Sequence, residues 1–485
     1  MNAQWKSTRR QLLTLASLGA LTAACTEDRR LRPLVTSSPV RTPTPSTASQ
    51  RVALPADLLL GLATSAYQIE GSVHADGRGP SIWDTFCARS GTIKDGSSGA
   101  ISCDHYRRWS SDLDLMALFG LKSYRFSVAW PRVLPDGRGA VNQRGLDFYK
   151  RLVDGLLTRG ISPMATLYHW DLPQALQDLG GWAERDGASW FADYARLVFD
   201  RLEGVERWLT INEPRIIVQY GHQRGQHAPG IADDRVAGRT LHHLGLAHGL
   251  AVQAFRSSKA KGSIGPCHVV TPCYPADDSS AAKRATAVAD ARLNTLYLDP
   301  MLTGQYPPSL AKLEDGLQQG IESAEKGNDL NVISETVDFV GVNYYTPAVI
   351  DAKGNRRDNF PVTPINWPIY PNGLTDVLNR LHREYNVRIA VTENGIAGLA
   401  NETLSDSHRT AFLRDHLLAL QRATDAGARV ESFHAWSFLD NFEWAQGYTQ
   451  RWGLFHVDFA TQQRTPKHSG RWFADVIARH SVPVA

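Results

Sequence analysis

Two glutamates stand at the ends of apolar runs and carry the side chains best suited to chemistry. Glu213 ends the run 208–213, and Glu393 ends the run 389–393. A single glutamate in such a place is more often a solvated loop residue. Two carboxyl groups that face one another across a cleft can divide proton donation, proton acceptance and nucleophilic attack between them. The pair therefore predicts acid–base and nucleophilic chemistry if the fold brings the two side chains together.

Further polar and aromatic residues follow the other apolar runs. They are Gln68, Glu70, Arg125, His169, Trp170, Asn212, Tyr344, Tyr345, Asn394, Trp436, Glu443 and Trp444. Any one of them would be unremarkable in a loop. Their recurrence after nearly every run predicts that they share one rim of the fold.

Eight short apolar runs must position these residues. The runs are Leu58–Ala66, Leu121–Ala129, Ile161–Tyr168, Val205–Ile211, Ser263–Thr271, Val337–Tyr344, Arg388–Thr392 and Val430–Ser437. Amphipathic stretches lie between them, at Asn142–Arg159, Ala188–Leu202, Thr240–Lys259 and Ser407–Ala426. Nearly continuous apolar runs that alternate with helical patterns are typical of buried parallel strands.

This alternation predicts an α/β fold, a single (β/α)8 TIM barrel over residues 53–483. In such barrels the active site lies at the C-terminal ends of the strands, which is where the polar residues occur. The fourth and seventh runs, which are followed by Glu213 and Glu393, would lie on opposite sides of the barrel mouth. A doubly wound open sheet is the alternative, but no glycine fingerprint for a dinucleotide follows the first run.

The overall charge excludes one class of partner. The 485 residues carry a formal charge of +3, and 13 tryptophans accompany a 42% apolar content. Lys6, Arg9 and Arg10 account for the whole excess, because residues 1–24 contain no acid. The rest of the chain is neutral, so we expect no binding of nucleic acid.

The first 24 residues are predicted to be a signal peptide. Basic residues precede the apolar run Leu12–Ala24, and Ser7–Leu13 resembles a twin-arginine export signal. The segment Leu21–Cys25 resembles a bacterial lipobox, in which Cys25 would be lipidated; simple cleavage near Ala24 is the alternative. We expect an exported protein, periplasmic, cell-surface or secreted, that contacts a membrane only through this anchor.

Residues 25–52 are rich in Pro, Ser and Thr and are predicted to form a disordered linker. Four cysteines follow it, Cys87, Cys103, Cys267 and Cys273. Cys87–Cys103 is the disulfide to test first, with buried free thiols as the alternative. Their spacing suits no metal site, and we expect neither a metal ion nor a cofactor.

The chain also resembles a known family over residues 54–482. The matching segments are Ala63–Gly71, Tyr124–Ser127 with Trp130–Arg132, His169–Pro173, Asn212–Pro214, Gly341–Tyr345, Thr392–Gly395 and Trp436–Trp444. Seven segments in the same order resemble glycoside hydrolase family 1, of the β-glucosidase type. The resemblance implies a retaining β-glycosidase that acts on terminal β-D-glucosyl residues of small-molecule or oligosaccharide β-glycosides through a covalent glycosyl-enzyme.

The resemblance also implies the role of each rim residue. Glu213 would be the acid and base and Glu393 the nucleophile, with Arg125 and Tyr345 holding Glu393 in its charged form. Residues implied to bind the sugar are Gln68, His169, Asn212, Trp436, Glu443 and Trp444. Trp367 would line the leaving-group side, and a carboxylate at position 443 implies an unphosphorylated sugar.

Two other functions stay open at this point. A β-galactosidase or β-fucosidase of the same family would differ only in contacts to the outer hydroxyls of the sugar. An exported sugar-binding lipoprotein would keep the pocket without turnover, although it would be expected to have lost one of the two catalytic glutamates. The natural leaving group and the oligomeric state are not determined by the sequence.

Overall fold

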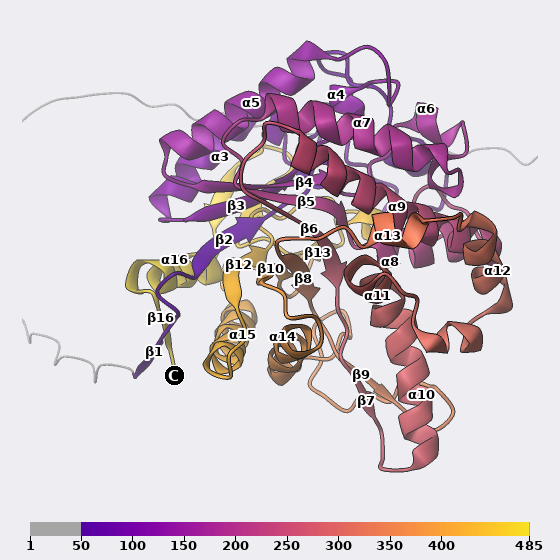
Figure 1. The fold of residues 1–485 in the computed structure, drawn as a ribbon. Coiled ribbons are helices and arrows are strands. Elements are labelled where there is room, and N and C mark those ends of the chain that lie inside the picture. The colour runs from indigo at the N-terminus through magenta and orange to yellow at the C-terminus, as the bar shows by residue number, and fades with distance from the viewer. Residues whose placement is uncertain (1–49, 485) are drawn as a thin grey trace, which may run out of the picture. The chain divides into compact units, whose positions relative to one another are not determined.

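The computed structural model describes residues 50–484, and its centre is a closed barrel of eight parallel strands (Figure 1). The strands are β2 (Leu59–Ala63), β3 (Ser123–Ser127), β4 (Ser162–Tyr168), β5 (Arg207–Asn212), β6 (Ser263–Val269), β8 (Val340–Tyr344), β10 (Ile389–Asn394) and β12 (Val430–Trp436). They pair in the order β10-β12-β2-β3-β4-β5-β6-β8 before the ring closes. The predicted (β/α)8 barrel is confirmed, and each strand lies within or almost within its predicted run.

The barrel strands are buried on both faces. A small cluster that includes Met164, Leu209, Cys267 and Ala390 fills the inside of the ring, while the large apolar core lies between the strands and the surrounding helices. Both faces of each strand must therefore be mainly apolar. This explains why the eight sequence runs lack the polar–apolar alternation of a half-exposed strand. Some buried polar side chains interrupt this pattern within the strands, among them Arg125 in β3 and His434 in β12.

Helices surround the ring (Figure 1). The larger ones are α3 (His105–Leu118), α5 (Gln143–Thr158), α7 (Asp186–Arg201), α9 (Asp234–Ser257), α14 (Pro371–Tyr385), α15 (Ser407–Asp425) and α16 (His468–Arg479). In α5, Leu146, Tyr149, Val153 and Leu156 are buried at helical spacing and form the stripe that packs on the strands. The four predicted helical stretches correspond to α5, α7, α9 and α15.

A small sheet joins the two ends of the described chain. Strand β1 (Arg51–Ala53) pairs antiparallel with β16 (Ser481–Pro483), and Val52 lies opposite Val482. The folded region therefore begins at β1, inside the linker predicted for residues 25–52. The three residues that pair with β1 lie more than 400 positions away in the sequence. The composition of residues 25–52 alone therefore does not reveal the strand.

The connection from β6 to β8 is a long excursion. It holds β7 (Cys273–Pro275), α10 (Ser280–Asp290), α11 (Leu296–Thr303), α12 (Asp315–Ala324) and α13 (Asp329–Ile333). Strand β7 pairs with β9 (Ala348–Ile350), and Figure 1 shows this pair and α10 reaching outward from the barrel. These elements were not predicted from the sequence.

The predictions for the signal peptide (residues 1–24), for lipidation of Cys25 and for most of the linker lie outside the described residues. Within residues 50–484, no helix has the length and apolar character needed to cross a bilayer. The four cysteines of this region are free thiols, so the pair Cys87–Cys103 is not bonded. In the same region no cluster of three His, Cys, Asp or Glu side chains is placed to hold a metal ion.

Candidate active site

A cleft of about 640 Å³ opens at the C-terminal ends of the strands. Glu213, from the end of β5, and Glu393, in β10, both line it. The predicted residues His169, Tyr345, Trp367, Trp436, Glu443 and Trp444 line the same cleft. Parallel strands place all their C-terminal ends on one rim, which is why residues separated by more than 350 positions meet here.

Glu393 is held as a carboxylate. Arg125 in β3 forms a buried ion pair with its Oε1, and Tyr345 donates a hydrogen bond from its hydroxyl to Oε2 at 2.6 Å. Burial, followed by the charges of Glu393 and Glu213, raises the pKa of Tyr345 well above its usual value, so the phenol remains a donor. A cation and a neutral donor both favour the charged form of Glu393.

Glu213 lies in a different electrostatic environment. Its Oε1 accepts a hydrogen bond from Asn343 Nδ2 at 2.7 Å, and it forms no ion pair within the described residues. Burial, and then the negative charge of Glu393, raises the pKa of Glu213 to about 8, although Asn343 opposes the shift. Glu213 is therefore protonated near neutral pH while Glu393 is charged, which is the division of labour that acid catalysis and nucleophilic attack require.

The backbone of Glu213 is also unusual. It takes a left-handed conformation with φ of +48°, directly before the short helix α8 (Pro214–Ile216). Its N–H donates to the carbonyl of Cys267 at 2.8 Å, which fixes the turn. Trp170 and Trp444 in the same cleft also have positive φ, of +78° and +50°. Non-glycine residues in this region cost conformational energy, and they gather at functional sites.

A chain of hydrogen bonds links the two glutamates beneath the cleft. Asn212 Oδ1 accepts from Arg125 Nη2 at 2.7 Å and from Asn343 Nδ2 at 3.1 Å. Asn212 Nδ2 donates to His169 Nε2 at 3.1 Å, which assigns the proton of the imidazole to Nδ1. Burial and the charge of Arg125 lower the pKa of His169 well below its usual value, so the ring is neutral. Its Nδ1–H has no hydrogen-bond partner within residues 50–484 and remains a donor for a ligand.

Of the residues implied to bind the sugar, His169, Trp436, Glu443 and Trp444 line the cleft, while Gln68 and Asn212 are buried and hydrogen-bonded to Glu443 and His169. Gln68 Nε2 donates to Glu443 Oε2 at 3.2 Å, and Gln68 Oε1 accepts from Ser65 Oγ at 2.7 Å. The rings of Trp436 and Trp444 each lie parallel to His169, with ring centroids 6.0 Å apart. Flat aromatic faces beside amide and carboxyl groups suit the apolar faces and hydroxylated rim of a sugar ring.

The loop that carries Glu443 is anchored by buried charges. Asp440 accepts from Lys467 Nζ at 2.8 Å and from the N–H of Gly453 at 2.9 Å. The same ammonium donates to Glu402 at 2.6 Å, and its side chain is fully buried. A satisfied buried network holds its residues in one arrangement, so the loop after β12 presents Glu443 and Trp444 in a fixed position.

The outer part of the cleft has an aromatic wall. Tyr345 makes edge-on contacts with Trp367 and Trp452, with ring centroids 5.9 and 5.6 Å apart. Trp367 is 40% exposed, unlike the buried Trp436 and Trp444. An exposed indole at the cleft entrance is placed to contact a group that projects outward from the two glutamates.

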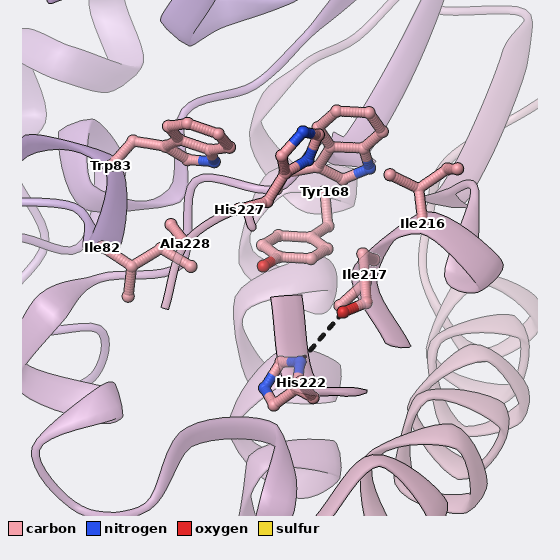
Figure 2. Close-up of a pocket in the computed structure, with 9 residues that line it drawn as sticks. Ile82, Trp83, Tyr168, Ile216, Ile217, His222, His227 and Ala228 are labelled. Carbon is pink, nitrogen blue, oxygen red and sulfur yellow. Dashed lines mark hydrogen bonds between the residues drawn. The ribbon is translucent and has the colours of Figure 1, made fainter. Parts of the chain in front are cut away.

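A second, much smaller pocket lies behind this cleft. Figure 2 shows its lining, which includes Ile82, Trp83, Ile216 and His227, and Ile216 and His227 also line the main cleft. Its volume of about 10 Å³ corresponds to roughly one water molecule. The pocket cannot hold a sugar, so we assign the chemistry to the larger cleft.

Sequence reasoning named Glu70 at the rim, and it missed Asn343 as a contact of Glu213. Glu70 does not line the cleft; it accepts hydrogen bonds from Arg132 Nε at 2.9 Å and from the hydroxyl of Tyr149 at 2.6 Å. Asn343 stands in the segment Gly341–Tyr345 used for the resemblance, two residues before Tyr345. Its position at the end of β8 was the available signal.

Comparisons with known proteins agree with this geometry. The sequence profile described as Glycosyl hydrolase family 1 matches residues 50–482. Beta-glucosidase A of Acetivibrio thermocellus is 42% identical over 443 residues, which cover 88% of this chain and 98% of that protein. The bifunctional beta-D-glucosidase/beta-D-fucosidase of Bifidobacterium breve is 38% identical, with coverage of 88% and 98%.

A solved structure is similar as well. The beta-glucosidase from Thermotoga maritima in complex with glucoimidazole superposes with a TM-score of 0.83 at 40% sequence identity, covering 88% of this chain and 99% of that one. The region matched by the family profile, residues 50–482, contains the whole barrel and every residue of the cleft described above. The chain belongs to glycosyl hydrolase family 1.

Proposed function

We propose that this protein is a retaining β-glucosidase that hydrolyses unphosphorylated β-D-glucosides, with Glu213 as acid and base and Glu393 as nucleophile. One observation carries the proposal: Glu393 is paired with Arg125 and Tyr345, while Glu213 in the same cleft has only Asn343 and a pKa raised to about 8. The names of the similar proteins, which are β-glucosidases, support the choice of glucose.

The first step forms the covalent intermediate. The Glu393 carboxylate attacks the anomeric carbon while the bond from that carbon to the leaving oxygen breaks. Glu213 gives its proton to this oxygen, and the leaving group departs as a neutral alcohol. The anomeric configuration inverts once. Asn212 lies between the two glutamates, where it can contact the 2-hydroxyl as positive charge develops on the ring.

The second step releases the sugar. Once Glu393 is esterified its negative charge is gone, which removes one of the two causes that raise the pKa of Glu213. Glu213 takes a proton from water as the oxygen of that water attacks the anomeric carbon. The ester bond breaks, Glu393 is regenerated as a carboxylate, and the second inversion gives overall retention.

Activity toward other sugars is a second candidate. The relative from Bifidobacterium breve is named for both glucosidase and fucosidase activity, which favours β-fucoside hydrolysis over strict glucose specificity here. A β-D-fucoside differs from the β-D-galactoside only in lacking the 6-hydroxyl group, so the ratio of their kcat/KM values reports the contribution of that hydroxyl, and the ratio of galactoside to glucoside reports the contribution of the configuration at C4. Glu443, near the wall that would receive the outer hydroxyls, is the reason we propose an unphosphorylated substrate.

Turnover of 4-nitrophenyl β-glucoside tests the function, with Glu393→Ala as the matched variant. Wild type is expected to release nitrophenol and the variant to lose that activity. Azide added to the variant can occupy the space of the missing carboxylate and attack the anomeric carbon, which would yield α-glucosyl azide. Undiminished turnover by the variant would refute the nucleophile assignment. No turnover of any β-glycoside by wild type would support the alternative of a sugar-binding lipoprotein.

We further propose that the protein is exported and anchored through a lipidated Cys25. The support is the sequence of residues 1–25, with its paired arginines, apolar run and lipobox-like end. Labelling of cells with a radioactive or alkyne-tagged fatty acid tests the anchor. The wild-type protein should be labelled and fractionate with membranes, whereas Cys25→Ala should be unlabelled. Retention of wild type in the cytoplasm would refute export.

A further inference from the structure

Arg215 places a positive charge on the leaving-group side of the cleft. It stands two residues after Glu213, within α8, and lines the cleft together with Ile216, Tyr220 and Leu293. Its Nη2 donates to Thr271 Oγ1 at 3.2 Å, in the segment that follows β6. Strands β5 and β6 lie across the ring from β12 and β2, which position Glu443 and Gln68. Arg215 is therefore on the side of Glu213 that faces away from the sugar wall.

The guanidinium of Arg215 lacks an anionic partner. Within residues 50–484 it forms no ion pair, and its Nε is buried without any hydrogen-bond acceptor. Among the described residues the hydroxyl of Thr271 is its single side-chain acceptor. A partly buried guanidinium loses hydration, and that cost is normally offset by a carboxylate. Residues 50–484 therefore supply no anion that pairs with this cation.

The other charges of the cleft do not satisfy Arg215. The acids that line the cleft are Glu213, Glu393 and Glu443. Glu393 is paired with Arg125, and burial raises the pKa of both Glu213 and Glu443 to about 8, so these two are largely protonated near pH 7. The cleft therefore contains an uncompensated cation close to the place where the leaving group must lie.

We propose that Arg215 recognises a carboxylate on the leaving group, so that the preferred substrates are β-glucosides of carboxylate-bearing aromatic alcohols. The inference rests on the proposed function, because it assigns the leaving-group side from Glu213. A guanidinium presents parallel N–H groups that match the two oxygens of a carboxylate. The exposed indole of Trp367 at the cleft entrance supplies flat contact for the ring that carries this carboxylate.

The test compares matched substrates that differ in charge. Values of kcat/KM are measured for the β-glucosides of 3- and 4-hydroxybenzoate and of their methyl esters, with wild type, Arg215→Met and Arg215→Gln. For each variant, kcat/KM of the acid is divided by kcat/KM of its methyl ester, and this ratio is then divided by the same ratio for wild type. The second division cancels the intrinsic reactivity of each leaving group. Arg284→Met is the control, since Arg284 is exposed on α10, does not line the cleft and loses the same charge.

We expect the acid-to-ester ratio to fall at least about tenfold in both Arg215 variants for one of the two isomers, as for loss of a charge-assisted contact. The ratio should stay within about twofold in the control. A ratio that changes equally little in all variants would overturn the proposal. A uniform loss for acid and ester alike would also overturn it, because Arg215 would then act only on Glu213 or on the fold.

A binding measurement separates this inference from the proposed function. Isothermal titration with 3- and 4-hydroxybenzoate and their methyl esters needs no turnover. Tighter binding of one acid than of its ester to wild type, lost in Arg215→Met, would support the carboxylate site even if neither glucoside is hydrolysed. Equal affinity of acid and ester for wild type would overturn it, whatever the hydrolytic activity.

Discussion

Replacement of Glu213 by alanine tests the assignment of the acid most directly. Burial and the charge of Glu393 raise the pKa of Glu213 to about 8, so about nine-tenths of the enzyme holds the proton at pH 7. At pH 9 only about one-tenth does, and kcat/KM of wild type should have fallen roughly tenfold from its plateau. The sign follows from the need for a protonated acid: activity is present below the pKa and lost above it.

The size of the effect should depend on the leaving group. General acid catalysis contributes about 10²–10⁴-fold, so Glu213→Ala should lower kcat/KM for phenyl β-glucoside by that factor. Dinitrophenolate leaves without a proton, so kcat/KM for 2,4-dinitrophenyl β-glucoside should fall by less than about tenfold. Glu213→Gln, which keeps the shape of the side chain, is the matched variant and should behave in the same way.

The assay is kcat/KM for both substrates between pH 5 and about pH 10. With phenyl β-glucoside the fall near pH 8 should be present in wild type and absent in Glu213→Ala, and with 2,4-dinitrophenyl β-glucoside it should be small in both enzymes. Glu443 requires a control, because burial, then the charges of Glu393 and Glu213, also raises its pKa to about 8. Glu443→Gln should bind substrate poorly yet keep the fall. A fall that persists in Glu213→Ala and disappears in Glu443→Gln would refute the reasoning and assign the titration to the sugar wall.

Three further predictions concern stability. Lys467→Met removes the nearer of the two cations of the buried Asp440 and leaves only Arg451 at 3.5 Å, so it should cost about 3–5 kcal/mol and lower the calorimetric Tm by several degrees. Burial opposes ionisation of Glu402, yet hydrogen bonds and nearby cations lower its pKa to about 2. The stability that this group contributes is therefore present above its unfolded pKa of about 4.5 and is lost as the pH falls toward 2. Glu402→Gln should flatten the dependence of the urea unfolding midpoint on pH across that window. Glu213→Gly should be about 1–2 kcal/mol more stable than Glu213→Ala in urea, because glycine accepts φ of +48° without strain.

The barrel could be predicted because its burial leaves a local mark. A strand covered on both faces needs an unbroken apolar run, and the polar residue that ends it marks the rim. Glu213 and Glu393 were found in this way, and the fold brings them to one cleft. The strand pair β1–β16 and the helices between β6 and β8 left no such mark, since they depend on partners distant in sequence or on surface packing.

The buried ion network around Asp440 shows a different limit. Lys467 and Glu402 resemble solvated surface charges in the sequence, because a charged residue carries no local sign of its burial. In the fold, Lys467 has no exposed side-chain area and is bonded to two carboxylates. The contact between Asn343 and Glu213 was missed for the same reason: it joins residues 130 positions apart.

The distribution of cations around the two glutamates explains how one cleft can hold both an acid and a nucleophile. Arg125 reaches Glu393 directly and reaches Glu213 only through the amides of Asn212 and Asn343. An ion pair with Glu213 would stabilise its charged form and remove the proton that the leaving group needs. The neutral amide of Asn343 beside Glu213 is therefore as necessary as the guanidinium of Arg125 beside Glu393. Arg215 fits this arrangement. Its positive charge lowers the pKa of Glu213 in part, and an anionic leaving group would offset that charge at the step in which Glu213 must donate its proton.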